Sequence, residues 1–480
     1  MAAPERWVRT GPAPVAPGDR SIAAGRPRIV PALRVDGIVE AAPRRPAAQR
    51  VPSSRRNAKP DGAAMTEETA LQAARERAAT MPLEEIDVSD PELFRQGVAL
   101  PYFARLRRDA PIHWQPEGHH GAFWSVTRFQ DIMAVDTNHA DFSSDWRRGG
   151  ITVVDVAPAR QMPMFIAMDP PRHDEERKAV APIVAPTNLA RLSGTIRERV
   201  VDILDHLPRD EPFDWVDRVS VELTTRMLAT LFDFPFEDRR LLTHWSNVST
   251  YSPPESKPES WAWRDGELRA CLEYFTRLWN ERVNAPPRPD LVSMLAHSPA
   301  TRNMTPEEYL GNLTLLIVGG NDTTRNSISG GLLFFDRNPG EWAKLRANPA
   351  LVPGAVSEII RYQTPLAHMR RTAVRDVELG GHRIREGDKV VMWYVSGNRD
   401  DTAIEEPDAF RVDRARPRQH LSFGFGIHRC VGNRLAEMQL AILLEEMLAR
   451  DLKVEVTGEP ERVPSSFING YKHVMARIVG

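Results

Sequence analysis

The most informative stretch of the chain reads Phe423-Gly424-Phe425-Gly426-Ile427-His428-Arg429-Cys430-Val431-Gly432. Its glycines let the backbone turn sharply and let a flat ligand approach closely. The amphipathic pattern that follows predicts a helix from Asn433 to Arg450, whose positive end and free amide groups would stabilise a thiolate at Cys430. Such a thiolate could be a covalent nucleophile or a haem ligand, whereas most lone cysteines are inert parts of a core.

A long helix is predicted upstream, where Thr305-Pro306-Glu307-Glu308 combines a capping box with proline at the first helical position. The pattern continues to Asn338 and would span about 50 Å at about 1.5 Å per residue. Its middle reads Gly319-Gly320-Asn321-Asp322-Thr323-Thr324. Each glycine costs about 1 kcal/mol relative to alanine, so some gain should offset the pair. They leave room for a ligand, and an acid followed by an alcohol offers a proton route. Taken alone, the segment would better suit close helix packing with polar residues that face solvent.

The pattern Phe423-x-x-Gly426-x-x-x-Cys430-x-Gly432 resembles the haem-binding loop of the cytochrome P-450 superfamily, and three further motifs occur in the family's order. The resemblance extends over roughly residues 85–480. It implies a mainly α, single-domain cytochrome P-450 fold with a long central helix, small β-sheets and haem b between helices. It also implies that Cys430 is the axial ligand to the haem iron, where a thiolate pushes electron density through iron and favours O–O bond cleavage.

The same resemblance assigns roles on the long helix. Asp322 and Thr323 match the family's acid–alcohol pair, which implies that Asp322 relays protons and that Thr323 hydrogen-bonds dioxygen at the iron. The family usually has alanine where this chain has Gly319, so the pocket should be slightly roomier here. Haem propionates need cations or donors around the ring edge. Four residues match the family's propionate positions: His173, Arg177, Arg371 and His428.

A scaffold motif is also present. Glu358 and Arg361 match the family's Glu-x-x-Arg helix motif, which implies a buried structural ion pair. Its usual third partner is an arginine immediately before a phenylalanine, but Ala409 precedes Phe410 here. Arg411 and Arg414 are the candidates to replace it.

Between these motifs the hydrophobic pattern predicts a helix over Val356 to Tyr362 and then a small sheet. The sheet would contain Thr372 to Leu379, a Gly380-Gly381 turn, His382 to Ile384 and Lys389 to Val395.

Composition excludes several classes of protein. The 480 residues contain 63 Lys+Arg and 65 Asp+Glu, a net charge of −2, which argues against a general nucleic-acid binder. No window approaches about 18 uninterrupted apolar residues, so no integral membrane segment is expected. Two cysteines cannot form a disulfide framework, and we expect a cytoplasmic protein.

The N-terminus differs from the rest of the chain. Residues 1–64 hold 10 of the 40 prolines and give no stable period. We predict a disordered Pro/Ala/Arg-rich extension, or a start assigned too early with Met65 as the true beginning. Residues 65–480 would then form the haem-thiolate monooxygenase domain.

Electrons must come from a separate protein, because this length leaves no space for a fused flavin reductase and no dinucleotide or ferredoxin motif is present. We expect transfer from NAD(P)H through a ferredoxin reductase and a [2Fe-2S] ferredoxin. Residues 410–434 offer a basic docking face with only Asp413 as an acid, unless its arginines merely serve haem and scaffold. They are Arg411, Arg414, Arg416, Arg418, Arg429 and Arg434.

Substrate segments of the family fall on mostly aliphatic residues, which suits a small hydrophobic substrate. The segments Leu316–Asn326, Asp214–Asp217 and Leu231–Arg240 resemble the soluble bacterial branch of alkane and fatty-acid terminal (omega) hydroxylases. They imply hydroxylation of the terminal methyl of medium-chain alkanes or fatty acids. The expected pocket residues are Leu316, Ile317, Gly320, Leu366 and Phe467.

Two alternatives stay open. Within the family, the substrate could be a terpene or a monoterpene alcohol. In a different class, the chain could be a non-catalytic haem-based ligand sensor, which would need neither a proton relay nor a docking face.

Overall fold

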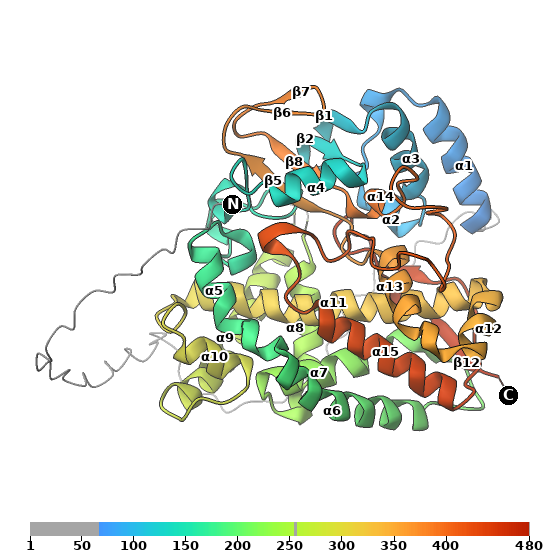
Figure 1. Ribbon diagram of the computed structural model, residues 1–480. Helices are drawn as coiled ribbons and strands as arrows, with labels where there is room; N and C mark the ends of the chain where they lie inside the picture. Colours follow the sequence, from blue (N-terminus) through green and yellow to red (C-terminus); the bar gives the residue numbers. More distant parts are fainter. Residues whose placement is uncertain (1–66, 254–256, 480) are drawn as a thin grey trace, which may run out of the picture. The chain divides into compact units, whose positions relative to one another are not determined.

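The computed structural model describes residues 67–253 and 257–479, so the predicted extension over residues 1–64 lies outside the described residues. The described chain is mainly helical with small β-sheets, as predicted (Figure 1). The helices are α1 Glu67–Thr80, α2 Pro91–Arg95, α3 Ala99–Asp109, α4 Phe129–Thr137, α5 Arg172–Val180, α6 Pro186–Asp205, α7 Glu222–Phe232, α8 Arg240–Thr250, α9 Pro258–Val283, α10 Leu291–His297, α11 Pro306–Arg337, α12 Pro339–Ala347, α13 Val352–Gln363, α14 Tyr394–Gly397 and α15 Asn433–Ala449.

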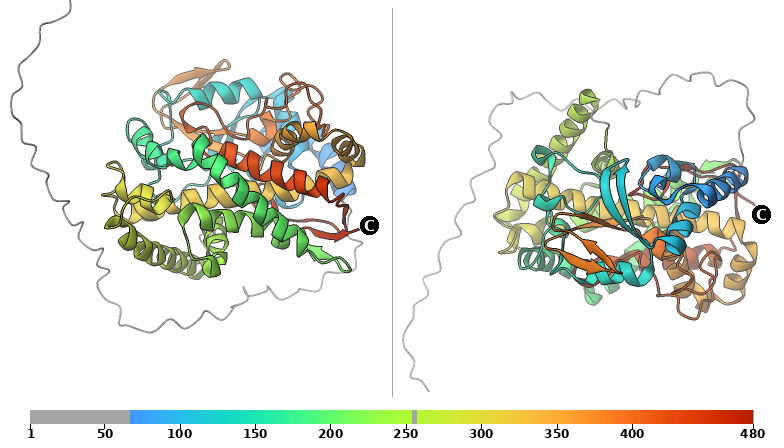
Figure 2. Two further views of the ribbon diagram at one scale, coloured as in Figure 1. Left: turned by 60° about the horizontal axis from the view of Figure 1, so that its bottom comes forward. Right: turned by 90° about the horizontal axis from the view of Figure 1, so that it is seen from above.

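The predicted long helix is α11, and both halves of its capping box are present. The backbone N–H of Glu308 donates to Thr305 Oγ1 at 3.3 Å, and the N–H of Thr305 donates to Glu308 Oε2 at 2.9 Å. The helix crosses the described part of the chain between the strands on one side and α6, α7 and α8 on the other (Figures 1 and 2). Because it is packed on most sides, its residues can reach both the core and an internal site.

The predicted small sheet is wrong in two respects. Thr372 to Leu379 is not one strand, because the backbone N–H of Val374 leaves the ladder and donates to Asp141 O at 2.9 Å. The last strand also stops at Met392, and α14 follows. The strands are β1 Ile112–Gly118, β2 Gly121–Val126, β3 Phe142–Ser143, β4 Phe213–Asp214, β5 Met369–Ala373, β6 Val377–Leu379, β7 His382–Ile384, β8 Lys389–Met392, β9 Val454–Val456, β10 Glu461–Arg462, β11 Tyr471–His473 and β12 Met475–Ile478.

These strands form four sheets. The largest has the order β1-β2-β8-β5-β3, with β2 and β8 parallel and the other pairs antiparallel. The hairpin of β6 and β7 is a separate sheet, as are β10-β11 and β4-β12-β9. Strand β5 carries Arg371, one of the predicted propionate residues, into the interior.

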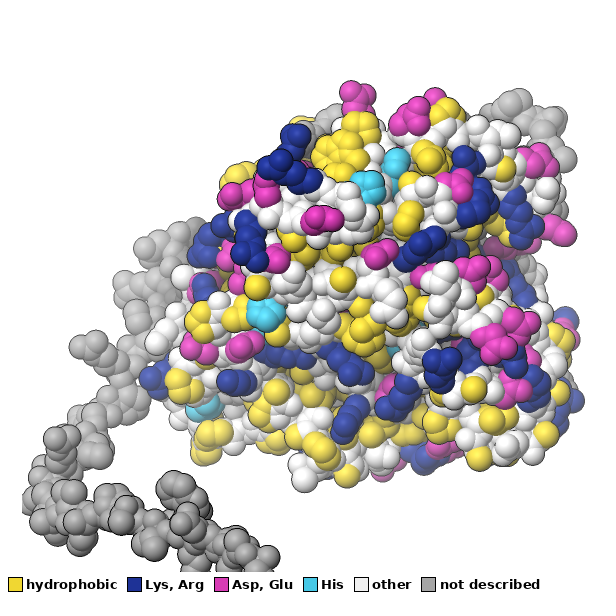
Figure 3. Space-filling view, turned by 45° about the horizontal axis from the view of Figure 1, so that its top comes forward, with side chains coloured by type: hydrophobic (Ala, Val, Ile, Leu, Met, Phe, Trp, Pro, Cys, Tyr) yellow, Lys and Arg dark blue, Asp and Glu magenta, His cyan; other side chains and the backbone are white. Residues whose placement is uncertain are grey.

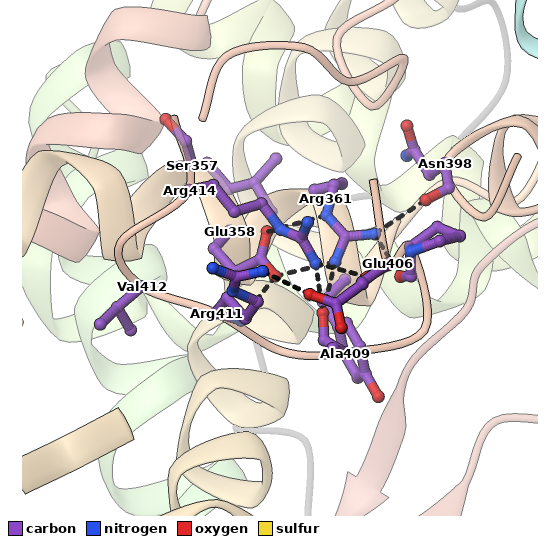
Figure 4. A network of polar contacts seen from close by, with 12 residues as sticks. Ser357, Glu358, Arg361, Asn398, Glu406, Ala409, Arg411, Val412 and Arg414 are labelled. Carbon is purple, nitrogen blue, oxygen red and sulfur yellow. Dashed lines mark hydrogen bonds and ion pairs between the residues drawn. The ribbon is translucent and has the colours of Figure 1, made fainter. Parts of the chain in front are cut away.

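A buried ion pair on α13 joins that helix to the loop before the cysteine (Figure 4). Arg361 donates through Nε and Nη2 to the two carboxylate oxygens of Glu358, both at 2.8 Å. Arg414 Nε also donates to Glu358 Oε2 at 2.8 Å, while Arg411 contributes its backbone N–H. Arg414 therefore takes the third position. Burial alone would raise the pKa of the Glu358 carboxyl, but these hydrogen bonds and positive charges hold it below its usual value.

We predict that Arg414→Met lowers the free energy of unfolding by at least about 2 kcal/mol, because it leaves a fully buried carboxylate short of a cationic donor. Arg411→Met is the matched control, since that side chain pairs with the exposed Glu406, and its effect should stay within about 0.5 kcal/mol. Urea unfolding of the two haem-loaded variants compares them. Equal midpoints for both variants would contradict the role of Arg414.

Candidate functional site

A cavity of about 3580 Å³ is lined by α11, by the cysteine loop (residues 423–432) and by the segment before α5. Its walls include Thr323 from α11 and Cys430 from the loop. The two sequence motifs singled out for chemistry, which lie about a hundred residues apart, thus meet at one internal space.

Hydrogen bonds and close packing define the shape of the cysteine loop. The backbone N–H of Cys430 donates to Phe423 O at 2.8 Å, which closes the loop on itself. Gly424 and Gly426 have φ of +64° and +65°, a left-handed conformation that favours glycine. At Gly426 an added Cβ would come within 2.7 Å of Asp136 O, so the loop also needs glycine in order to approach α4 this closely.

Asp136, at the end of α4, anchors this loop and is almost fully buried. Its Oδ2 accepts hydrogen bonds from the backbone N–H of Phe425 and from the hydroxyl of Tyr394, both at 2.8 Å. Its Oδ1 pairs with Arg371 at 2.7 Å. One carboxylate therefore fixes the loop to β5 and α14, and no sequence motif had pointed to it.

Cys430 is exposed and lines the cavity. Desolvation raises the pKa of its thiol, while the backbone N–H of Gly432 and the positive charges of Arg177 and Arg429 act in the opposite direction. A thiolate at this position is therefore best stabilised by a cation that binds the sulfur directly, which is what a haem iron would do.

The predicted propionate residues gather near this loop. Arg177, Arg371 and His428 line the cavity, and the His173 ring lies 4.4 Å from that of His428, centroid to centroid. Both ring nitrogens of His428 and Nε2 of His173 are buried without a hydrogen-bond partner. Orphaned buried donors beside an open cavity and a thiol fit a haem whose carboxylates would accept from them. Their role as propionate ligands stays a prediction.

The acid–alcohol pair points in two directions. Thr323 lines the cavity, and its hydroxyl donates to Gly319 O at 3.0 Å. Asp322 is fully buried and faces α8, where its carboxylate accepts a hydrogen bond from Ser246 Oγ at 3.0 Å. It also forms an ion pair with Arg325, one turn further along α11. Nothing in the sequence indicated Ser246, because it lies on another helix. The spacing of three between Asp322 and Arg325, by contrast, could have indicated their ion pair.

Four of the five expected pocket residues line the cavity: Leu316, Gly320, Leu366 and Phe467. Ile317 does not, because its side chain is fully buried in the hydrophobic core. An added Cβ at Gly320 would lie 2.7 Å from a methyl of Leu228 on α7, whereas one at Gly319 would meet nothing within 4 Å. The free space is therefore at Gly319, and Gly320 allows α7 to approach α11.

The predicted basic face is smaller than the sequence suggested. Arg414 is used by Glu358, and Arg411 pairs with Glu406. Arg418 is exposed but lies 3.2 Å from Glu437. The remaining cations, Arg416, Arg429 and Arg434, are exposed. Within residues 67–253 and 257–479, no helix is long and apolar enough to cross a membrane.

Comparisons with known proteins show the family to which this chain belongs. The cytochrome P450 family model matches residues 280–470. Linalool 8-monooxygenase of Pseudomonas putida is 37% identical over 83% of this chain and 100% of its own length. Two solved structures each cover 82% of this chain and 99% of their own, with a TM-score of 0.78: cytochrome P450-153 from Novosphingobium aromaticivorans, 47% identical, and CYP153D17 from Sphingomonas sp. PAMC 26605, 49% identical. The chain belongs to the cytochrome P450 family of monooxygenases.

Proposed function

We propose that this monooxygenase hydroxylates the terminal methyl group of medium-chain alkanes or fatty acids, using dioxygen and electrons from a separate ferredoxin. The observation that carries the proposal is the aliphatic wall beside Thr323. Leu315, Leu316 and Val318 from α11 lie on it together with Leu366 and Phe467. Bound haem would supply the oxygen-activating iron with Cys430 as its thiolate ligand, and His173, Arg177, Arg371 and His428 would hold its carboxylates.

The part of this wall that lies outside α11 is built from two adjacent extended segments. The backbone N–H of Ala367 donates to Phe467 O at 2.9 Å, and Leu366 forms an isolated bridge with Ile468. Burial of a hydrocarbon tail contributes about 0.8 kcal/mol per methylene but has no direction. Because terminal C–H bonds are the strongest in such a chain, these side chains must admit the chain end first. Gly319 leaves the space that the end carbon would occupy.

Proton delivery is assigned to the acid–alcohol pair. The Thr323 hydroxyl is the polar group that α11 places on the cavity wall one turn from Gly319, and Asp322 lies behind it. Arg325 and Ser246 hold the Asp322 carboxylate in an otherwise buried position. A proton donor beside an apolar pocket suits a reaction that consumes protons, and it has no use in a ligand sensor.

A second candidate is a monoterpene-alcohol hydroxylase of the same family. It is favoured by the 37% identity to a linalool 8-monooxygenase, which this chain matches over that protein's full length. A branched terpene is shorter and wider than a dodecanoic acid chain, so the product pattern separates the two candidates.

We predict that Thr323→Ala leaves haem and substrate binding intact but uncouples the enzyme, with NADH still consumed, more hydrogen peroxide released and less alcohol formed. Thr276→Ala is the control, because it removes the same kind of hydroxyl-to-carbonyl bond on α9, outside the cavity. Unchanged coupling in Thr323→Ala would remove the proposed role. A parent protein that consumes no NADH with any ferredoxin system would favour the sensor.

Product analysis by gas chromatography tests terminal selectivity. The parent enzyme should give mainly primary alcohol from octane and mainly ω-hydroxylated product from dodecanoic acid, and Leu366→Ala should raise the share of internal alcohols several-fold by widening the approach. Leu448→Ala, a partly buried leucine on α15 that does not line the cavity, should leave the ratio unchanged. Mainly internal products from the parent would refute terminal hydroxylation, and turnover restricted to a terpene would support the second candidate.

Ferredoxin docking at Arg416, Arg429 and Arg434 predicts that reduction slows as salt rises, because surface attraction is screened within about 10 Å at 0.1 M salt. Figure 3 shows basic side chains interspersed with apolar, uncharged and acidic ones on one face of the molecule. Arg434→Glu should slow reduction at low salt, as followed by stopped-flow absorbance. Arg269→Glu makes the same charge change on α9 and should not. Equal rates for both variants would contradict this docking face.

A further inference from the structure

A second cavity, of about 390 Å³, opens on the other side of α7 from the haem site. Helix α7 presents Leu228 and Leu231 to the first cavity but Ala229 and Thr230 to the second, and the two cavities share no lining residue. The neighbouring helix α6 lies beside α7 (Figures 1 and 2) and lines the second cavity with it. The established activity gives this cavity no role.

Its charges are unbalanced. The acids in its wall are already used, since Asp233 Oδ2 lies 2.7 Å from both Arg282 and Arg288, and Asp290 caps α10 by accepting from the Ser293 N–H at 2.8 Å. Two further wall arginines, Arg191 and Arg199, form no ion pair within the described residues. The cavity therefore holds two guanidinium groups that no carboxylate neutralises.

Both arginines lie on α6, and within the described residues their hydrogen bonds go to uncharged groups. Arg191 donates to Asn188 Oδ1 at 2.9 and 3.1 Å, and it is exposed. Arg199 donates to the backbone carbonyl of Arg226 and is partly buried. Desolvation and the nearby charge of Arg226 lower the pKa of the Arg199 guanidinium, although Glu198 acts in the opposite direction. An incoming anion would relieve this unfavourable environment.

An aromatic face completes the site. The Phe236 side chain is 46% exposed at the cavity, unusually high for a large apolar group in this chain. The Arg239 guanidinium lies 4.3 Å from its ring centroid, and that of Arg199 lies 5.9 Å away. A ligand that carries its negative charges next to a flat apolar group would use both features.

We propose that this cavity binds a phosphate monoester whose planar ring lies against Phe236. Two guanidinium groups without an ion pair supply the positive charge that a phosphate dianion needs, and each of them can donate hydrogen bonds to its oxygens. A nucleoside monophosphate has the required combination of dianion and planar ring. The site lies outside the substrate cavity. A molecule bound there would therefore be an additional ligand of the monooxygenase, not its substrate in a second position.

Isothermal titration of the haem-loaded enzyme with AMP, adenosine and inorganic phosphate, at matched ionic strength, tests this. AMP should bind, and adenosine should bind at least tenfold more weakly. Arg199→Met should lower the affinity for AMP at least tenfold. Arg191→Met, a substitution at an exposed position, should also lower the affinity for AMP. Arg269→Met on α9 is the control and should bind AMP like the parent.

Phe236→Leu should bring the affinity for AMP down to that for inorganic phosphate, while leaving phosphate itself unchanged. Absence of AMP binding would overturn the proposal, as would binding that survives both arginine substitutions or binding of adenosine equal to that of AMP. Each of these results is independent of which hydrocarbon the enzyme oxidises.

Discussion

The buried carboxylate of Asp136 is the contact on which the geometry of the site depends. It is a single group that holds the cysteine loop by the Phe425 N–H, β5 by Arg371 and α14 by Tyr394. These three partners come from segments far apart in the chain, and their hydrogen bonds saturate the charge without solvent. Cys430 can therefore face the cavity on a loop that is anchored at several points.

The second constraint comes from α11. Its two central glycines serve different purposes, because Gly320 lets α7 pack closely while Gly319 keeps space free beside Thr323. The neighbouring acid and alcohol divide in the same way, since Asp322 is tied to α8 and Thr323 faces the cavity. One face of this helix therefore packs against its neighbours, and the adjacent face lines the cavity.

Local patterns in the sequence were sufficient for the long helix, its capping box, the cysteine loop and the Glu358–Arg361 pair. They failed where the answer depends on which way a buried helix is turned: Ile317 was expected on the pocket wall but lies in the core. They also could not choose between Arg411 and Arg414, because that depends on how the loop folds back onto α13. Asp136 and Ser246 had no local signal at all, since their partners are remote in sequence.

The most direct test of the whole account is the absorption spectrum of the reduced, carbon-monoxide-bound enzyme after Cys430→Ser. The change is nearly isosteric, so packing should survive while the thiolate is lost. The red-shifted Soret band typical of thiolate-bound haem should disappear in this variant and persist in Cys271→Ser, whose sulfur is buried away from the cavity. Retention of that band in Cys430→Ser would contradict the assignment of the ligand.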